Sequence, residues 1–309
     1  MIFFFYGPNT YAARQELQRM TDGYLKKVGT DFGLERLDGS GLTLKQLQSN
    51  LQASPFLATS RLVIIDGFGK MKVTGAELES MLAAVPATTV AVFYDAEVDQ
   101  RTAYYKTIIK IARTVKFEAE TGAQLVAWIA KETKRLGGSI DRTAAQALLD
   151  TAGEDQWRLS GELSKLVSYQ PAVTTETVKL LVVPQLNQTI FDLVEAMTAG
   201  RGKAALTLYH NLLAERTNEI YLLTMVIWQL RNLLLAKTSR GLSPNELAKA
   251  AGMSPYVAGK ALTAARAYDE TTLKQAFLAA AECEYKIKTG QIPPQPALEQ
   301  LILEIAAKR

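Results

Sequence analysis

The residues of this chain that could do chemistry lie where a phosphate-binding loop would be, directly after a short apolar run at residues 2–6. This run has the character of a buried strand, and Gly7-Pro8 then leads into a stretch over residues 10–27 that is typical of a helix. A P-loop occupies this strand–loop–helix order, and it binds phosphates through glycine backbone N–H groups, a lysine and a magnesium-binding hydroxyl. The chemistry that the position suggests is therefore ATP binding.

The side chains that a P-loop needs are missing. If Gly7 is the first glycine of the motif, the second glycine, the lysine and the threonine fall on Ala12, Ala13 and Arg14. Asp66 ends a second apolar run and resembles a magnesium-binding carboxylate, but no second carboxylate follows it to activate a water, and a strand-end turn explains it equally well. We predict a nucleotide-binding scaffold that does not hydrolyse ATP, in which Gly7-Pro8 shapes the exit from the strand.

Other catalytic or metal-binding chemistry finds little support in the composition. Cys283 and His210 are the single cysteine and histidine of the 309 residues, which leaves no intramolecular disulfide, cysteine-based zinc site or histidine-based triad. We expect no metal and no cofactor. A net charge of +4 decides nothing about partners. No apolar run approaches the roughly 18 to 20 uninterrupted residues of a membrane span, so we expect a cytoplasmic protein.

The first third of the chain alternates short apolar runs with amphipathic segments. This pattern is typical of parallel βαβ units whose sheet is covered on both faces. After the run at 2–6, the expected strands are 33–37, 61–66, 89–94 and 114–117. We therefore predict an α/β domain over residues 1–119.

Beyond residue 119 the strand signal disappears and the apolar period becomes 3.6. We predict a small helical domain over 120–184 and a helical bundle over 185–309. The bundle should contain five or six helices, depending on which short segments merge. Its central helix should be 219–237, which is apolar on almost every side. The candidate segments are 190–199, 203–214, 219–237, 244–251, 255–266, 271–286 and 296–307.

Three groups of motifs follow one another along nearly the whole chain. Residues 54–66 contain the pair Phe56-Leu57, a short polar turn, an arginine and a buried strand, and residues 155–166 contain a Glu-Leu-x-Lys-Leu helix. The third and strongest group comprises residues 191–196, 229–234, 285–290 and 297–303. In order and spacing these motifs resemble the delta subunit of bacterial DNA polymerase III, the clamp-loader subunit that opens the sliding clamp.

The resemblance implies three domains and a mechanical role. It implies a RecA-like, AAA+-type domain without working ATP chemistry, a small helical lid domain, and a helical collar that holds a loader pentamer together. The implied partners are the sliding clamp (beta subunit), the gamma/tau and delta prime subunits, and primed DNA in the assembled complex. Such a chain has no catalytic activity of its own, because nucleotidyl transfer belongs to the holoenzyme.

The resemblance also assigns clamp binding to Phe56-Leu57. In the family, two adjacent large apolar residues at the tip of a helix before this strand enter a hydrophobic pocket on the clamp. The family more often has leucine before phenylalanine, so the order is swapped here. Burying both should contribute roughly 1.5 to 3 kcal/mol apiece. Core packing is the alternative for such a pair, but the polar neighbours Ser54, Thr59 and Ser60 favour an exposed tip.

Residues 243–264 suggest a different function. They predict a helix, a glycine-containing turn and a second helix, which is the layout of a helix-turn-helix DNA reader. A specific reader would have Arg, Asn or Gln at the start of the second helix, whereas residues 255–258 are Pro, Tyr, Val and Ala. We prefer two collar helices, and keep a DNA-binding regulator and an atypical P-loop ATPase as alternatives. Basic residues that could contact DNA or a neighbouring subunit are Lys260, Arg266, Lys286 and Lys288.

Overall fold

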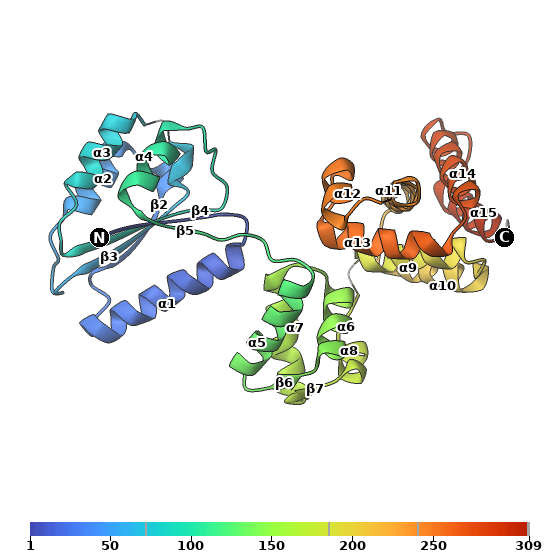
Figure 1. Ribbon diagram of the computed structural model, residues 1–309, viewed down its shortest axis with the longest axis horizontal. Coiled ribbons are helices and arrows are strands. Elements are labelled where there is room, and N and C mark those ends of the chain that lie inside the picture. The colour runs from blue at the N-terminus through green and yellow to red at the C-terminus, as the bar shows by residue number, and fades with distance from the viewer. Residues whose placement is uncertain (72, 185, 240, 308–309) are drawn as a thin grey trace. The chain divides into compact units, whose positions relative to one another are not determined.

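The computed structural model describes residues 1–71, 73–184, 186–239 and 241–307. It divides into two compact units, Met1–Glu120 and Thr121–Arg309, each of which appears in Figure 1. Residue 185, where we expected the third domain to begin, lies outside the described residues. The predicted boundary between lid and collar therefore stays a prediction.

The first unit is built on a five-stranded parallel sheet with the strand order β2-β3-β4-β1-β5. Each predicted strand is confirmed, with bounds that shift by one residue at most. The strands are β1 (Ile2–Tyr6), β2 (Leu34–Asp38), β3 (Arg61–Asp66), β4 (Thr89–Asp95) and β5 (Arg113–Lys116). The carboxyl ends of all five strands lie at one edge, where an open parallel sheet usually binds its ligands.

Helices cover both faces of this sheet (Figure 1). Because side chains alternate along a strand, Phe4 and Phe93 pack under one set of helices while Phe5 and Val92 pack against the opposite helix. Helix α1 (Thr10–Val28) covers one face. The other face carries α2 (Leu44–Gln52), α3 (Gly75–Ala83) and α4 (Ala103–Ile111), with the 3-10 turns η1 (Gly39–Gly41) and η2 (Phe68–Lys70). The result is the predicted α/β domain.

The second unit begins with four helices around one apolar cluster that includes Leu125, Leu148 and Leu163. They are α5 (Ala123–Arg135), α6 (Arg142–Ala152), α7 (Gln156–Tyr169) and α8 (Thr175–Leu181). Our expectation that no strand follows residue 119 is wrong, because β6 (Ser139–Ile140) and β7 (Ala172–Val173) pair in parallel. Two-residue strands leave no period in a sequence. The pairing depends on Gly138, where a Cβ atom would lie 2.7 Å from the Pro171 carbonyl oxygen.

The remaining residues form a helical bundle. Its helices are α9 (Leu186–Thr198), α10 (Gly202–Ala214), α11 (Glu219–Thr238), α12 (Pro244–Ala251), α13 (Pro255–Ala264), the 3-10 turn η3 (Ala265–Ala267), α14 (Glu270–Lys288) and α15 (Pro294–Ala307). The described part of the bundle thus has seven α-helices, not five or six. Helices α12 and α13 do not merge, because Gly252 takes a left-handed conformation (φ 69°) and Ser254 caps the next helix.

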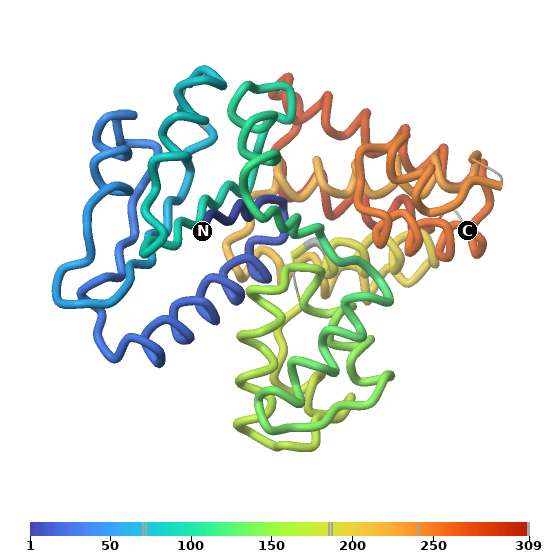
Figure 2. Tube along the Cα trace, turned by 60° about the vertical axis from the view of Figure 1, so that its left-hand side comes forward, coloured from blue at the N-terminus to red at the C-terminus, as the bar shows by residue number. Residues whose placement is uncertain are grey.

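Helix α11 is the central helix, as predicted. Leu222, Leu223, Val226 and Leu230 are almost completely buried on it, and they belong to the core shared with α9, α10, α14 and α15. The last helix of the chain, α15, packs against α9 and α10 at the start of the bundle (Figure 2). By length and composition alone α11 is also the one helix among the described residues that could cross a membrane. Its burial in the bundle core accounts for that composition.

Candidate functional site

The connection between β1 and α1 contains just Gly7, Pro8 and Asn9. Gly7 has φ 125°, and a Cβ atom there would lie 2.3 Å from the Phe117 carbonyl oxygen. The Gly7 N–H donates to the Asp95 carbonyl at 3.2 Å, and the Asn9 N–H donates to the Phe117 carbonyl at 3.1 Å. The connection therefore lies directly against the ends of β4 and β5, where a P-loop would wrap around phosphates.

The side chain of Asn9 caps the amino terminus of α1. Its side chain is buried, with Oδ1 accepting from the Ala12 N–H at 3.0 Å and Nδ2 donating to the Glu118 carbonyl at 3.2 Å. A phosphate at this helix end would compete with that cap for a helical N–H. We did not predict this role from the sequence, although an asparagine directly before a helix is the usual signal for a cap.

Ala13 and Arg14, which stand where a P-loop has its lysine and threonine, have side chains that contact other parts of the same domain. Ala13 is completely buried in the core between α1 and the sheet, so a lysine there could not reach a phosphate without displacing that core. Arg14 forms an ion pair with Asp66, and its guanidinium carbon lies 5.1 Å from the centre of the Tyr94 ring. The carboxylate that could hold magnesium is therefore neutralised by an arginine of the same chain.

A second carboxylate, Asp95, lies at the end of β4 and is buried. The Tyr104 hydroxyl donates to its Oδ2 at 2.7 Å, and the Gly69 N–H donates to its Oδ1 at 2.8 Å. Burial and the neighbouring Asp95 together raise the pKa of Tyr104 well above its ordinary value. Both partners hold Asp95 in the structure of the domain, which assigns it a structural role.

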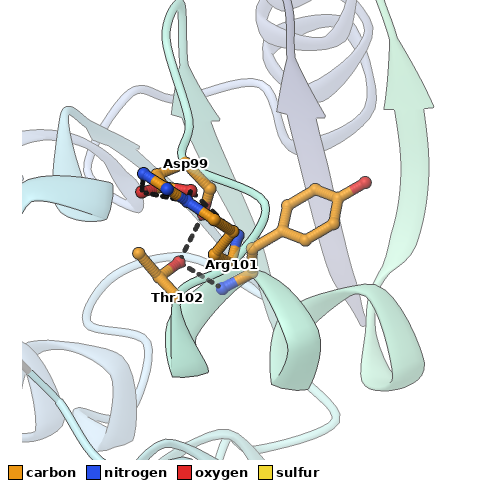
Figure 3. Close-up of polar contacts among 4 residues, drawn as sticks. Asp99, Arg101 and Thr102 are labelled. Carbon is orange, nitrogen blue, oxygen red and sulfur yellow. Dashed lines mark hydrogen bonds and ion pairs between the residues drawn. The ribbon is translucent and has the colours of Figure 1, made fainter.

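The turn from β4 into α4 contains the exposed ion pair of Asp99 and Arg101 (Figure 3). The Arg101 guanidinium donates to both carboxylate oxygens, at 2.9 and 2.8 Å, and its backbone N–H donates to Oδ1. Next to it, the Thr102 hydroxyl donates to the Asp99 carbonyl at 2.7 Å and accepts from the Tyr105 N–H. The group fixes the start of α4.

We predict that this carboxyl group titrates unusually low. The Arg101 side chain and then its backbone N–H lower the pKa of Asp99 from 3.8 to about 2. A lowered folded-state pKa means that the stabilisation is present above the unfolded value of about 3.9 and is lost as the pH falls towards 2. NMR titration should show this pKa, and Arg101→Ala should return it towards 3.8. An unchanged pKa in the variant would contradict the assignment to Arg101.

The Phe56-Leu57 pair is exposed. Phe56 retains 75% and Leu57 66% of their accessible surface, so the alternative of core packing is wrong. The pair lies in the connection over residues 53–60, after α2 has ended at Gln52. Leu57 has φ 53°, and it shares a positive φ with Arg216 alone among the described non-glycine residues. A left-handed conformation costs a leucine about 1 to 2 kcal/mol, so the neighbouring structure must impose it.

The four basic residues that we singled out lie on three elements. The Lys260 ammonium lies 3.2 Å from Asp150 Oδ1 and donates to Gln188 Oε1 at 2.9 Å. Lys286 and Lys288 each pair with a glutamate four residues earlier on α14, at 2.8 and 2.9 Å, and Arg266 is exposed on η3. Lys260 is therefore engaged within the chain. A contact of these four residues with DNA or with a neighbouring subunit stays a prediction.

The helix pair α12–α13 lacks the exposed reading residues of a helix-turn-helix protein. At the start of α13, the Ser254 hydroxyl donates to Glu154 Oε2 at 2.6 Å, and the Tyr256 hydroxyl donates to Asp150. Burial first, and then the Asp150 carboxylate, raise the pKa of Tyr256. The residues that would face DNA bases are thus hydrogen-bonded to α6 and the turn after it, which favours a structural role.

Together, the strand order, the helices on both sheet faces and the internally capped β1–α1 connection define an AAA+-type domain, followed by a helical part of the chain. The family model for DNA polymerase III, delta subunit, matches residues 3–118, and the model for the C-terminal domain of the same subunit matches residues 187–305. The chain belongs to the DNA polymerase III delta subunit family.

One sequence relative and one solved structure, both from Bacillus subtilis, resemble the chain over nearly its full length. DNA polymerase III subunit delta of strain 168 is 23% identical over 98% of this chain and 92% of its own. The solved structure of the DNA clamp loader delta protein has a TM-score of 0.71 at 22% identity, and the match covers 99% of this chain and 95% of that one. A gamma subunit-related protein of Thermotoga maritima, with a TM-score of 0.34 at 14% identity, is too distant to support an argument.

Proposed function

We propose that this chain is the clamp-loader subunit that binds and opens the sliding clamp during DNA replication, and that Phe56 and Leu57 are its main contacts with the clamp. The observation that carries this proposal is the exposure of two adjacent large apolar side chains on the connection between α2 and β3. Large apolar side chains that are exposed next to each other favour a protein-interaction site. Family membership supplies the class of partner.

Clamp opening would follow from differential binding. A closed ring and an open ring are two states of the clamp, and a subunit that binds the open state more tightly shifts the population towards it. The collar over residues 185–309 would join the chain to the gamma/tau and delta prime subunits, which would supply ATP-driven motion in the cytoplasm. Primed DNA would enter the assembled complex.

We propose further that the chain neither binds nor hydrolyses ATP. Four features support this: the short β1–α1 connection, the Asn9 cap on α1, the burial of Ala13 and the Arg14–Asp66 ion pair. Each feature removes or blocks a contact that a bound nucleotide or its magnesium would need.

The test is binding of the purified full chain to the sliding clamp of the same organism, with and without ATP, together with release of closed clamps from circular DNA. We expect tight binding and clamp release without ATP, no ATP turnover, and no shift of the unfolding temperature by MgATP. ATP turnover by the chain would favour the atypical ATPase. Clamp-independent, strongly salt-dependent binding to duplex DNA would favour the DNA-binding regulator.

A further inference from the structure

Arg61 is a buried arginine directly after the exposed connection. It is the first residue of β3, and 4% of its surface is accessible. Its Nη1 donates to the carbonyl oxygens of Asn50 at 2.6 Å and Ala53 at 2.8 Å, and its Nη2 donates to Glu35 Oε1 at 2.7 Å. A charge is rarely buried so completely unless its hydrogen bonds are satisfied. The guanidinium is thus a fixed part of the domain.

The two carbonyl groups that Arg61 binds lie at the end of α2. The last carbonyls of a helix have no partner within the helix, and a cation near them is favourable. Arg61 supplies both the donors and the charge, from the first residue of the next strand. It therefore joins the two ends of the connection over residues 53–60, which carries Phe56 and Leu57.

A second set of contacts fixes the end of the same connection. The Tyr24 hydroxyl donates to the Ser60 carbonyl at 2.8 Å, and the Leu62 N–H donates to the Gly33 carbonyl at 2.8 Å. Gly33 lies so close that a Cβ atom on it would be 2.4 Å from the Ser60 carbonyl oxygen. With both ends held, the connection can keep Leu57 in its left-handed conformation.

We propose that Arg61 is a positioning residue for clamp binding: it holds the ends of the 53–60 connection so that Phe56 and Leu57 are presented in one conformation. This inference rests on the proposed docking role of the pair. A flexible connection would have to be ordered on binding, and that ordering would weaken the interface. Arg61 itself touches no clamp residue in this scheme and acts through the connection alone.

The experiment compares Arg61→Met and Arg61→Lys with the native full chain, well below the unfolding temperature. We expect Arg61→Met to bind the clamp about tenfold more weakly or worse, because the connection loses its fixed conformation. Arg61→Lys, which keeps the charge but loses the planar fork, should lie between Arg61→Met and the native chain. Hydrogen exchange at residues 53–60 should become faster in Arg61→Met, while exchange in β4 stays unchanged.

Tyr104→Phe is the matched control, because it removes a buried hydrogen bond to Asp95 on the same sheet without touching the connection. It should lower the stability of the domain and leave the clamp affinity unchanged. If both Tyr104→Phe and Arg61→Met lose clamp affinity in proportion to their loss of stability, the positioning role is overturned.

A thermodynamic cycle separates this inference from the docking proposal. In a Phe56→Ala background, Arg61→Met should have a smaller effect than in the native chain, because it acts through the pair. Fully additive effects, or native affinity in Arg61→Met, would overturn the inference and leave the docking role of Phe56 and Leu57 intact. If the native chain fails to bind the clamp, or the pair proves dispensable, the docking proposal fails and the positioning role fails with it.

Discussion

Replacing Phe56 and Leu57 together by alanine should weaken binding of the chain to the sliding clamp by at least about 100-fold. The expected loss is roughly 1.5 to 3 kcal/mol for each side chain buried at the interface, and about 1.4 kcal/mol corresponds to a factor of ten. Because both side chains are largely exposed in the free chain, their removal should leave the stability of the fold nearly unchanged. Titration calorimetry or surface binding with the purified clamp measures the effect.

The matched control for this variant is Tyr169→Ala with Leu180→Ala. Tyr169 is 60% and Leu180 67% exposed, so the control removes a similar apolar surface from the helical part of the chain. It should bind the clamp like the native chain. Equal losses of clamp affinity in both double variants would show a general effect of exposed apolar surface. Native affinity in the Phe56→Ala, Leu57→Ala variant would show that the pair does not contact the clamp.

Gly7→Ala should destabilise the first unit by about 3 kcal/mol. Gly7 has φ 125°, and the new methyl group would meet the Phe117 carbonyl oxygen at 2.3 Å, so backbone must move. The strain of an unfavourable φ adds to that displacement. This large effect would arise from packing of the β1–α1 connection, with no nucleotide involved.

The stability of the two units can be measured separately in the Gly7→Ala variant, because the tryptophans all lie in one of them. All three tryptophans, Trp128, Trp157 and Trp228, lie in the second unit, so tryptophan fluorescence during urea unfolding reports that unit and serves as an internal reference. Hydrogen exchange in β1 and β5 reports the first unit. Gly23→Ala is the control. Gly23 lies within α1, and a Cβ atom there would have no neighbouring atom within 4 Å, so the change should stabilise the first unit by about 0.5 to 1 kcal/mol. Native stability in Gly7→Ala would contradict the close approach to Phe117.

Much of the fold could be predicted from the sequence because local pattern and burial coincide there. The strand at residues 2–6 is apolar throughout, as a strand covered on both faces must be, and the central helix at 219–237 is apolar on nearly every side. Where elements are very short, pattern gives no signal. The two-residue strands β6 and β7 form through a close backbone contact at Gly138, and no period marks them.

The sequence determined which residue types stand at the P-loop positions, and the tertiary structure determined which contacts these residues make. Residue types alone remove the phosphate ligands, because Ala12, Ala13 and Arg14 offer neither glycine nor lysine at those positions. What replaces the ligands could not be predicted, since the Arg14–Asp66 pair joins residues that are far apart in the sequence. Such contacts depend on how β1, α1 and β3 are placed around one another.

The same division holds for the candidate clamp contacts. The sequence determined that two large apolar residues stand between polar neighbours before a strand, but an apolar pair is compatible with either a core or an interface. Tertiary structure alone decided that Phe56 and Leu57 are exposed and that Arg61 is buried. The physical reason is that exposure depends on the packing of α2 and β3, and an arginine becomes buried only where distant carbonyls and a carboxylate meet its donors.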